Sequence, residues 1–474
     1  MTLRDLIGEG APAVEISGLA YSSGSVAPGY LFFCVPGFKA DGHAFAPDAV
    51  ERGAAALVCE RPLGLGVPEV VVDDVRAAMG PIAARFHGDP TATLRVAGVT
   101  GTNGKTTTTY LIRAILEAAG ERTGLLGTVT SIVGGQEEPV ERTTPEAIDL
   151  QGLFRRMLDS GDTACAMEVS SHALELGRAG GIHFASRVFT NLTQDHLDFH
   201  PDMEAYFQAK RRLFEGPGPA IVNTDDEYGR RLAGELPDAT TYAIDRDAAY
   251  RARDVRFDPG GSEFTCDTPD GEVRVTTRLP GLFNVSNALA AAAAARSLGV
   301  PLDTVVSALA EAGRVPGRFE PVDEGQPFTA LVDYAHTPDS LENVLRAARQ
   351  ITRGRLHVVF GAGGDRDSAK RPLMGRAASE LADRVIVTSD NPRSEDPESI
   401  VDQIMAGTGS GAEREVDRRR AIELAVAAAE PGDVVVVAGK GHEQGQEFEG
   451  GRKEPFDDVT VVREALRSAQ GARA

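Results

Sequence analysis

The chain has 474 residues, which corresponds to about two to four domains at roughly 100–200 residues each. Hydrophobic residues make up 42% and charged residues 25%, which is ordinary for a globular protein with complete hydrophobic cores. The formal net charge of −21 argues against a general nucleic-acid binder, because such proteins need a basic surface, and a polyanionic substrate would require local cationic pockets or magnesium.

The four cysteines, Cys34, Cys59, Cys165 and Cys266, include no C-x-x-C pair, so neither a zinc site nor a disulfide framework is predicted. We expect reduced, mostly buried thiols in the cytosol. The N-terminus has no apolar signal core, and the longest apolar run, residues 288–295, is far shorter than the roughly 20 residues that span a bilayer. The sequence therefore predicts a soluble, cytoplasmic protein without membrane insertion.

Residues 1–94 alternate short apolar runs with Gly/Pro turns and are predicted to form a small α/β domain. An apolar strand is then expected at residues 94–99, followed by a Gly-rich loop at 100–107 and an amphipathic helix at 108–119. This succession is how a nucleotide-binding α/β domain begins. The expected strands in these two parts of the chain are residues 31–35, 54–59, 70–72, 94–99, 163–167, 187–190 and 220–222.

The pair Pro316-Gly317 indicates a linker before the last part of the chain. Strand-like runs separated by helical stretches follow, as in a doubly wound sheet. They are residues 330–333, 356–360, 385–388 and 434–438. The whole pattern predicts three α/β domains, at residues 1–94, 95–315 and 316–474, with a P-loop-type central domain and a Rossmann-like C-terminal domain.

The strongest local signal is the run GVTGTNGKTT at residues 98–107. Val99 occupies the first-glycine position of the phosphate-loop pattern G-x-x-x-x-G-K-[ST], whereas Gly104, Lys105 and Thr106 fit its end. Small residues still allow backbone N–H groups to face phosphates, and the following helix adds its positive N-terminus. We expect Lys105 to bridge the β- and γ-phosphates and Thr106 to bind magnesium. The alternative is a glycine-rich turn ahead of a helix.

Further motifs follow in order along almost the whole chain. They are MEVSSH at residues 167–172, TNLTQDHLD at 190–198, Y-x-x-A-K-x-x-L-F at 206–214, N-x-x-N at 284–287, PGR-x-E at 316–320, DYAHTP at 333–338, GDRD at 364–367 and GKGHE at 439–443. Together with VTGTNGKTTT, this ordered set resembles the Mur ligase family and its folylpolyglutamate synthase relatives. Each motif is weak by itself, whereas their ordered occurrence is specific.

The resemblance implies an ATP-dependent ligase that turns a carboxylate into an acyl phosphate, which an amine then attacks. Cations must neutralise the anions that meet in such a reaction. The implied catalytic residues are Lys105, Glu168, His196 and Lys210, and the implied Mg²⁺ ligands are Thr106, Glu168, His196 and a carbamylated Lys210. Carbamylation needs a neutral amine, which burial favours. The alternative for Lys210 is an exposed helix lysine.

The same resemblance implies an ATP site that extends beyond the phosphate loop. Its residues are Gly101, Thr102, Asn103, Gly104, Lys105, Thr106, Thr107, Asn287, Arg318 and Asp333. Asn287 is expected near the adenine, while Arg318 and Asp333 are expected to reach the nucleotide from the linker and the third domain. His336 is close to that site in the sequence and receives no role.

The N-terminal domain resembles the UDP-binding domain of the family branch that makes UDP-muramoyl tripeptides. The implied contacts to UDP and the muramoyl-dipeptide are Ser22, Phe38, Lys39, Ala40, Thr143, Thr144, Ser170 and Arg178. Four positions depart from the family pattern: Tyr21 replaces the usual Asp, Ser23 the usual Arg, Arg142 the usual Asn and Leu176 the usual Gln. These departures concern individual substrate contacts and leave the ATP and metal residues intact.

The segment DNPR at residues 390–393 follows an expected strand, at the carboxyl end where α/β sheets bind ligands. It resembles the branch that adds meso-2,6-diaminopimelate to UDP-N-acetylmuramoyl-L-alanyl-D-glutamate, since lysine-adding relatives lack the arginine. The forked guanidinium of Arg393 suits the extra carboxylate of diaminopimelate, and Glu443 suits its distal ammonium. The implied diaminopimelate-binding residues are Arg366, Asp390, Asn391, Pro392, Arg393, Gly439 and Glu443.

Three alternatives remain beside this hypothesis. One is another ligase of the superfamily, above all the L-lysine-adding enzyme. Another is a nucleotide-binding scaffold that has lost catalysis, which the presence of Lys105, Glu168, His196 and Lys210 disfavours. The third is NAD binding at residues 361–364, which lack the G-x-G-x-x-G spacing. We expect a monomer whose partners are UDP-N-acetylmuramoyl-dipeptide, meso-diaminopimelate and ATP, with no nucleic acid.

Overall fold

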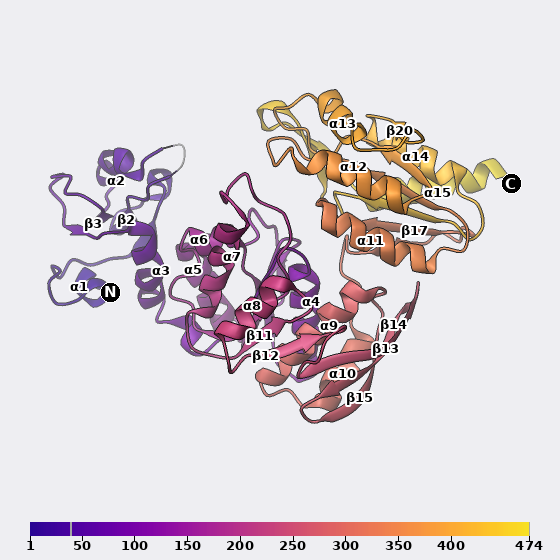
Figure 1. Ribbon diagram of the computed structural model, residues 1–474. Coiled ribbons are helices and arrows are strands. Elements are labelled where there is room, and N and C mark those ends of the chain that lie inside the picture. The colour runs from indigo at the N-terminus through magenta and orange to yellow at the C-terminus, as the bar shows by residue number, and fades with distance from the viewer. Residues whose placement is uncertain (38–39, 474) are drawn as a thin grey trace. The chain divides into compact units, whose positions relative to one another are not determined.

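The computed structural model describes residues 1–37 and 40–473 (Figure 1). The chain forms two compact units. Unit 1 contains residues 1–100, 120–187 and 209–218, and unit 2 contains residues 101–119, 188–208 and 219 onward. The boundary between β5 and the phosphate loop therefore coincides with the boundary between the units.

Unit 1 begins with a four-stranded parallel sheet in the order β1-β2-β3-β4. Its elements are α1 (Leu3–Ile7), β1 (Gly18–Ala20), η1 (Ser23–Ser25), β2 (Tyr30–Phe33), η2 (Gly42–Phe45), α2 (Ala46–Glu51), β3 (Ala56–Cys59), β4 (Glu69–Val71) and α3 (Val75–Phe86). Successive residues of β2 point to opposite faces, so Leu31 and Phe33 enter one hydrophobic core and Phe32 enters another. Helices cover the sheet, as the apolar runs predicted.

The rest of unit 1 has the strand order β10-β5-β9-β6-β7-β8. Its elements are η3 (Pro90–Ala92), β5 (Arg95–Thr100), β6 (Thr123–Leu126), β7 (Ser131–Val133), β8 (Gln136–Glu138), α5 (Ala147–Asp159), β9 (Ala164–Glu168), α6 (Ser171–Glu175), β10 (Phe184–Phe189, whose last residues belong to unit 2) and η4 (Arg212–Phe214). Strands β5, β9 and β6 are parallel, and every residue of β9 is buried. Such two-sided burial is typical of a parallel sheet covered on both faces.

Unit 2 begins with the phosphate loop and α4 (Lys105–Ala118), which packs against α9. Its strands β11 to β15 lie side by side in chain order, with β13, β14 and β15 antiparallel. The elements are α7 (Met203–Arg211, whose last residues belong to unit 1), β11 (Ala220–Asn223), α8 (Glu227–Glu235), β12 (Thr240–Ala243), β13 (Tyr250–Asp258), β14 (Gly261–Thr268), β15 (Gly271–Thr277), α9 (Leu282–Ser297) and α10 (Leu302–Glu311). The alanine-rich run 288–295 is the buried interior of α9.

The C-terminal part of unit 2 is a six-stranded sheet in the order β16-β17-β21-β18-β19-β20. All strand pairs of this sheet are parallel except β16–β17, and β22 and β23 form a separate antiparallel pair. The elements are β16 (Glu320–Val322), β17 (Thr329–Asp333), α11 (Pro338–Ile351), β18 (Leu356–Phe360), α12 (Lys370–Leu381), β19 (Arg384–Val387), α13 (Pro397–Met405), β20 (Glu413–Arg414), α14 (Arg418–Ala428), β21 (Val434–Ala438), β22 (Gly445–Glu447), η5 (Glu449–Gly451), β23 (Lys453–Pro455) and α15 (Asp458–Arg473).

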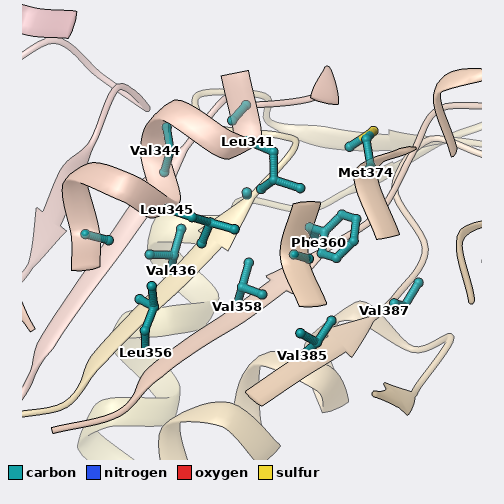
Figure 2. Packing of buried hydrophobic residues seen from close by; sticks show 14 of the residues in the cluster. Leu341, Val344, Leu345, Leu356, Val358, Phe360, Met374, Val385, Val387 and Val436 are labelled. Atoms are coloured by element: carbon teal, nitrogen blue, oxygen red, sulfur yellow. The ribbon is translucent and has the colours of Figure 1, made fainter. Parts of the chain in front are cut away.

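Hydrophobic cores lie on both faces of this sheet. Figure 2 shows one of them, in which Leu345 of α11 and Met374 of α12 join Val358 and Phe360 of β18. Alternate residues of the same strand, such as Val359, enter the opposite core. The register aligns Asp333, Phe360 and Ala438 at the carboxyl ends of three neighbouring strands. The loops that follow these ends are consequently close together.

The predicted α/β class is confirmed, and most predicted strands agree with observed strands to within one or two residues. Two boundaries were wrong by three residues: α4 begins at Lys105 instead of Thr108, and β10 begins at Phe184 instead of Arg187. All four cysteines are buried thiols, as expected. Within the described ranges, no helix has the length and apolarity needed to cross a membrane. The domain boundaries remain predictions.

Candidate active site

Two glycines shape the phosphate loop because side chains at these positions would collide with its neighbours. Gly101 and Gly104 have φ angles of +150° and +86°. A Cβ atom on Gly101 would lie 1.8 Å from Oγ1 of Thr190, and one on Gly104 would lie 2.4 Å from Oδ1 of Asn287. The loop therefore needs glycine both for backbone conformation and for close approach.

Lys105, the first residue of α4, lies across this loop. Its Nζ donates hydrogen bonds to the carbonyl oxygens of Gly101 at 2.9 Å and Thr102 at 2.8 Å. The ammonium group is thus held beside the backbone that faces the phosphates in loops of this kind. The structure therefore places the Lys105 ammonium against the loop backbone, and its contact with ATP phosphates stays a prediction.

The segment after β10 supports the loop from the side. The backbone N–H of Thr102 donates to the carbonyl oxygen of Asn191, and that of Asn103 donates to Oδ1 of Asn191, both at 2.9 Å. The Asn103 side chain donates to Asp339 of α11 at 2.9 Å. Sequence reasoning did not identify Asn191 or Asp339 as loop supports, although Asn191 lies within a recognised motif.

His196 follows this segment in a left-handed backbone conformation, with φ of +56°. Its Nε2 lies 3.4 Å from the carboxylate of Asp195, and Nε2 of His336 lies 3.9 Å from the same group. Burial alone would raise the pKa of Asp195, but the charges of His196, His336 and Lys370 lower it instead. His336, which received no role from the sequence, belongs to this charged group.

Arg318 reaches the phosphate-loop helix from the predicted linker. Its guanidinium donates to Oγ1 of Thr106 at 3.1 Å and stacks over the Tyr334 ring, with Cζ 4.2 Å from the ring centroid. The buried Nη1 of Arg318 has no hydrogen-bond partner. A buried cation with a spare donor next to Thr106 suits an anionic ligand such as a nucleotide phosphate.

Asp333 ends β17 behind Arg318. Its carboxylate accepts backbone N–H groups from Phe319 and Ala335, both at 2.7 Å. Burial raises the pKa of Asp333, although Arg318 acts in the opposite direction. Asn287, also predicted to bind ATP, is buried and bonds Thr108 at 3.4 Å and Asn284 at 3.2 Å. These side chains lie in unit 2 with the phosphate loop.

Unit 1 contains the other two predicted catalytic residues. Glu168 ends β9, is almost completely buried, and accepts hydrogen bonds from the backbone N–H and the hydroxyl of Thr128 at 2.8 and 3.0 Å. Lys210 is 1% exposed, which contradicts the alternative of a solvent-exposed helix lysine. Among the described residues, no three His, Cys, Asp or Glu side chains are grouped closely enough to hold a metal.

A group of three arginines surrounds one carboxylate in unit 1. Glu146 lies 3.0 Å from both Arg142 and Arg178 and 3.7 Å from Arg76. The Nε of Arg178 and the Nη1 of Arg76 face this carboxylate as ion pairs without forming hydrogen bonds to it. Three arginines therefore share one carboxylate. Sequence reasoning identified Arg178 but not Arg76 or Glu146.

The predicted dipeptide contacts Thr143, Thr144 and Ser170 lie in the same unit. The Thr144 hydroxyl accepts the Ser170 backbone N–H at 3.1 Å, the Thr144 carbonyl oxygen accepts Nη1 of Arg178 at 3.2 Å, and the Thr143 hydroxyl lies 3.1 Å from that of Thr128. Thr144 therefore links Ser170 to the arginine group. Thr143 connects through Thr128 to Glu168.

Two of the departures from the family pattern are near each other. The Tyr21 hydroxyl donates to Asp149 at 2.8 Å, and burial together with this bond raises the pKa of Tyr21. Arg142 and Glu146 act electrostatically on the same tyrosine. Ser22 and Ala40 are exposed, and Phe38 and Lys39 lie outside the described residues. The structure therefore leaves the predicted uridine contacts without further detail.

The loops at the carboxyl edge of the C-terminal sheet bring most predicted amino-acid contacts together. Asn391 donates to Glu443 at 2.8 Å, and Lys440 donates to both Asn391 and Glu443 at 2.9 Å. Lys440 is fully buried and was not predicted. A Cβ on Gly439 would lie 2.4 Å from Oδ2 of Asp390, which explains the glycine.

Arg393 lies beside this network in a left-handed conformation, with φ of +52°. Its Nη1 donates to the carbonyl oxygen of Gly364 at 2.6 Å, and its Nε pairs with Glu447 at 3.1 Å. Its backbone N–H also donates to the carbonyl oxygen of Glu447. Arg366 is exposed and bonds only the carbonyl oxygen of its neighbour Asp365 at 3.0 Å. Arg393 is thus positioned from three sides, whereas Arg366 is not.

Comparison with known proteins gives three family matches in chain order. Residues 15–87 match the "Mur ligase family, catalytic domain", residues 99–295 the "Mur ligase middle domain" and residues 317–441 the "Mur ligase, glutamate ligase domain". The chain is 48% identical to the UDP-N-acetylmuramoyl-L-alanyl-D-glutamate--2,6-diaminopimelate ligase of Geobacillus thermodenitrificans, over 96% of this chain and 95% of that one. The protein of the same name from Streptomyces coelicolor is 48% identical over 99% and 96%.

Solved structures of Mur ligases also match this chain. One entitled "Structure of UDP-N-acetylmuramoyl-L-alanyl-D-glutamate--2, 6-diaminopimelate ligase" matches with a TM-score of 0.73 at 35% identity, covering 99% of both chains. MurF from Acinetobacter baumannii matches with a TM-score of 0.66 at 20% identity, covering 96% of this chain and 94% of that one. At 20% identity, the similarity to MurF shows only that the two proteins share a fold.

Proposed function

Because the chain belongs to the Mur ligase family, we propose that it is the ATP-dependent ligase that joins meso-2,6-diaminopimelate to UDP-N-acetylmuramoyl-L-alanyl-D-glutamate. The observation that carries this proposal is Arg393, which bonds Gly364 and Glu447 in the loop that also contains Asn391, the partner of Glu443, at the carboxyl edge of a Rossmann-like sheet. The L-lysine-adding ligase is not favoured, because lysine offers no second carboxylate for that guanidinium.

The reaction has two chemical steps. A carboxylate oxygen of the D-glutamyl residue attacks the γ-phosphorus of ATP, which gives an acyl phosphate and ADP. The amine of diaminopimelate then attacks the acyl carbon, an amide forms, phosphate leaves, and the amine loses a proton. The first step brings two anions together, so neutralising cations are the main requirement of the site.

Lys105 and Arg318 meet this requirement on the nucleotide side in unit 2. The Lys105 ammonium lies over the phosphate loop, and Nη1 of Arg318 is a buried donor without an acceptor. We assign both to the ATP phosphates, together with the backbone of residues 101–107. Asn287, near the adenine, and Asp333 complete the nucleotide contacts in this assignment.

We also propose Mg²⁺ as cofactor, with Thr106, Glu168 and His196 as protein ligands and a carbamylated Lys210 supporting a second Mg²⁺ ion. The donor set suits the ion, because Mg²⁺ binds through one or two carboxylates and keeps water and substrate phosphates as further ligands. The burial of Glu168 and Lys210 supports the proposal, since a buried lysine is disposed to the neutral form that carbamylation requires. The ion would neutralise phosphate charge during transfer.

On the substrate side, we assign the anionic groups of the UDP-muramoyl-dipeptide to the arginine group of unit 1. Arg76, Arg142 and Arg178 share a single carboxylate there, that of Glu146, so three cations face one anion. Thr144 lies beside them, accepting from Arg178 through its carbonyl oxygen and from the Ser170 N–H through its hydroxyl. Arg142 is a cation at a position where the family usually has a neutral Asn. We therefore expect the affinity of this chain for the dipeptide to fall more steeply with salt concentration than that of relatives with Asn.

The cell would use this reaction in peptidoglycan precursor synthesis, and hence in cell wall growth, cell shape and division. We place the enzyme in the cytoplasm, because its four cysteines are buried thiols of the kind kept reduced there. We further propose that it acts as a monomer, which sedimentation velocity would test.

A phosphate-release assay tests the proposed function. ADP and phosphate should form at equal rates only when ATP, Mg²⁺, UDP-muramoyl-dipeptide and meso-diaminopimelate are all present. Omission of any one component should reduce the rate to background. Steady phosphate release without the dipeptide or the amino acid would indicate an ATPase and would overturn the assignment.

A further inference from the structure

A cavity of about 400 Å³ lies within unit 1, apart from the residues assigned above. Its apolar walls are Ala77 of α3, Leu174 of α6, Ile182, Phe184 of β10, Leu213 of η4 and Pro217. A volume of this size is within the range of small-molecule sites, which are mostly apolar with a few polar groups. The polar side chains that contribute to the lining are His183, Arg187 and Arg212.

Of these polar side chains, Arg187 is the one without a counter-charge. It is 4% exposed, and its two Nη groups donate to the carbonyl oxygens of Gly216 and Gly218, while its Nε has no acceptor. Burial lowers the pKa of Arg187, and no charged neighbour contributes to the shift. A buried, unneutralised guanidinium costs free energy that a bound anion would recover.

The two charges at the rim are already neutralised. His183 lies 3.2 Å from Asp89, and Arg212 lies 3.1 Å from Glu175. Both side chains are substantially exposed, whereas Arg187 is enclosed. The one strong electrostatic feature of the cavity is therefore a single buried positive charge within apolar walls.

This cavity is distinct from the dipeptide site assigned above. Gly177 and Ala179 line the cavity, but the intervening Arg178 points its guanidinium at Glu146 and at the Thr144 carbonyl oxygen. None of Thr144, Glu146 and Arg178 contributes to the cavity lining. The same chain segment therefore separates two sites on its two sides.

We propose that this cavity is a binding site for a small monocarboxylate with an apolar body, anchored by Arg187. The carboxylate supplies the missing negative charge and accepts from the guanidinium, and the apolar body fills the space between Leu174, Phe184 and Leu213. A doubly charged anion such as phosphate fits less well, because a single cation faces it within apolar walls. The inference concerns binding alone and does not depend on the proposed ligase activity.

Titration of the full chain with four probes tests this inference. The probes are 3-phenylpropionate, its neutral amide 3-phenylpropanamide, acetate and inorganic phosphate, and binding is followed by ligand-observed NMR and calorimetry. We expect saturable binding of 3-phenylpropionate with a roughly millimolar Kd, at least about tenfold tighter than the amide or either small anion. Equal binding of the acid and its amide would overturn the role of Arg187.

Two variants locate the binding. Arg187→Gln removes the charge and should weaken 3-phenylpropionate binding at least about tenfold, without weakening the amide. Ala77→Phe fills the cavity from an exposed helix position, leaves Arg187 intact, and should abolish binding of the acid. The second variant keeps the test valid if Arg187→Gln does not fold, because Arg187 also holds Gly216 and Gly218.

The matched control is Ala427→Phe, an equivalent exposed change on α14 in unit 2, which should leave binding unchanged. Persistence of 3-phenylpropionate binding in Ala77→Phe would contradict the site. Displacement of the probe by saturating UDP-muramoyl-dipeptide would contradict its separation from the dipeptide site.

Discussion

Replacing Arg393 by alanine should remove most of the preference for meso-diaminopimelate over L-lysine. The backbone at this residue has φ of +52°, and this strain is the same for any side chain with a Cβ. Arg393→Ala therefore leaves the loop conformation largely unchanged and removes the guanidinium with its bonds to Gly364 and Glu447. The distal carboxylate of diaminopimelate loses its partner, whereas lysine has no such group.

The exposure of Arg393 sets the size of the effect. Loss of one partner of a fully desolvated charge pair costs roughly 2–5 kcal/mol. The Arg393 side chain is 22% exposed and that of its neighbour Glu447 36%, so solvent screening places the cost near the lower limit. About 2 kcal/mol corresponds to about a 30-fold decrease in kcat/KM for diaminopimelate. Arg393→Lys keeps the positive charge but loses the forked guanidinium donors. Its kcat/KM for diaminopimelate should lie between the values of the wild type and Arg393→Ala.

Initial rates with each amino acid as sole acceptor measure this effect. We expect kcat/KM for meso-diaminopimelate to fall about 30-fold in Arg393→Ala, while the low value for L-lysine changes less than about threefold. Arg452→Ala is the matched control, because Arg452 is 63% exposed and its ion-pair partner is the exposed Glu454. An equal decrease in kcat/KM for both amino acids in Arg393→Ala would show that Arg393 supports the loop and does not bind the distal carboxylate.

Three other experiments test the phosphate site, the carbamylated lysine and the burial of the cysteines. Lys105→Ala should lower kcat by at least about 10²–10³-fold with an unchanged melting temperature, and near-normal turnover would refute the phosphate assignment. Lys210→Ala should lose activity and regain part of it with added acetate, and ¹³C-bicarbonate should give a carbamate NMR signal in the wild type that the variant lacks; a signal common to both would contradict the assignment. Since burial raises the pKa values of Cys34 and Cys266 to about 12, only about one thiol in 10⁴ is ionised at pH 8, so iodoacetamide should label them only after unfolding. Rapid labelling of the native chain would contradict their burial.

The sequence predicted those parts of the site that depend on local pattern. The Gly-rich loop with Lys105 and the loop with Arg393 both follow apolar strands, and the parallel topology places such loops at one sheet edge. A strand and the residues that follow it thus determine where these side chains lie, whereas their roles stay predictions. The family resemblance supplied the rest of the predicted residues.

Contacts between distant parts of the chain could not be predicted from local sequence patterns. Arg76, Arg142 and Arg178 meet at Glu146 only in the folded unit, and the buried Lys440 takes its partners from two loops. Arginine and glutamate are common residue types, and although Lys440 lies within the GKGHE motif, the motif does not show which distant residues it meets. The antiparallel strands β13 to β15 were also missed, although Gly-rich turns at residues 259–261 and 268–271 signalled hairpins. The many charged residues in these strands hide the alternation of apolar and polar side chains that usually indicates a strand.

The most direct test of the central claim is a competition between amino acids for the same activated dipeptide. Purified chain is incubated with ATP, Mg²⁺, UDP-N-acetylmuramoyl-L-alanyl-D-glutamate and equal low concentrations of meso-diaminopimelate, L-lysine and L-ornithine, and the products are identified by mass spectrometry. We expect one predominant product, the diaminopimelate-containing UDP-muramoyl tripeptide, formed with one ADP per amide bond. Equal amounts of the lysine and diaminopimelate products would contradict the specificity, and the absence of any amide product would contradict the ligase itself.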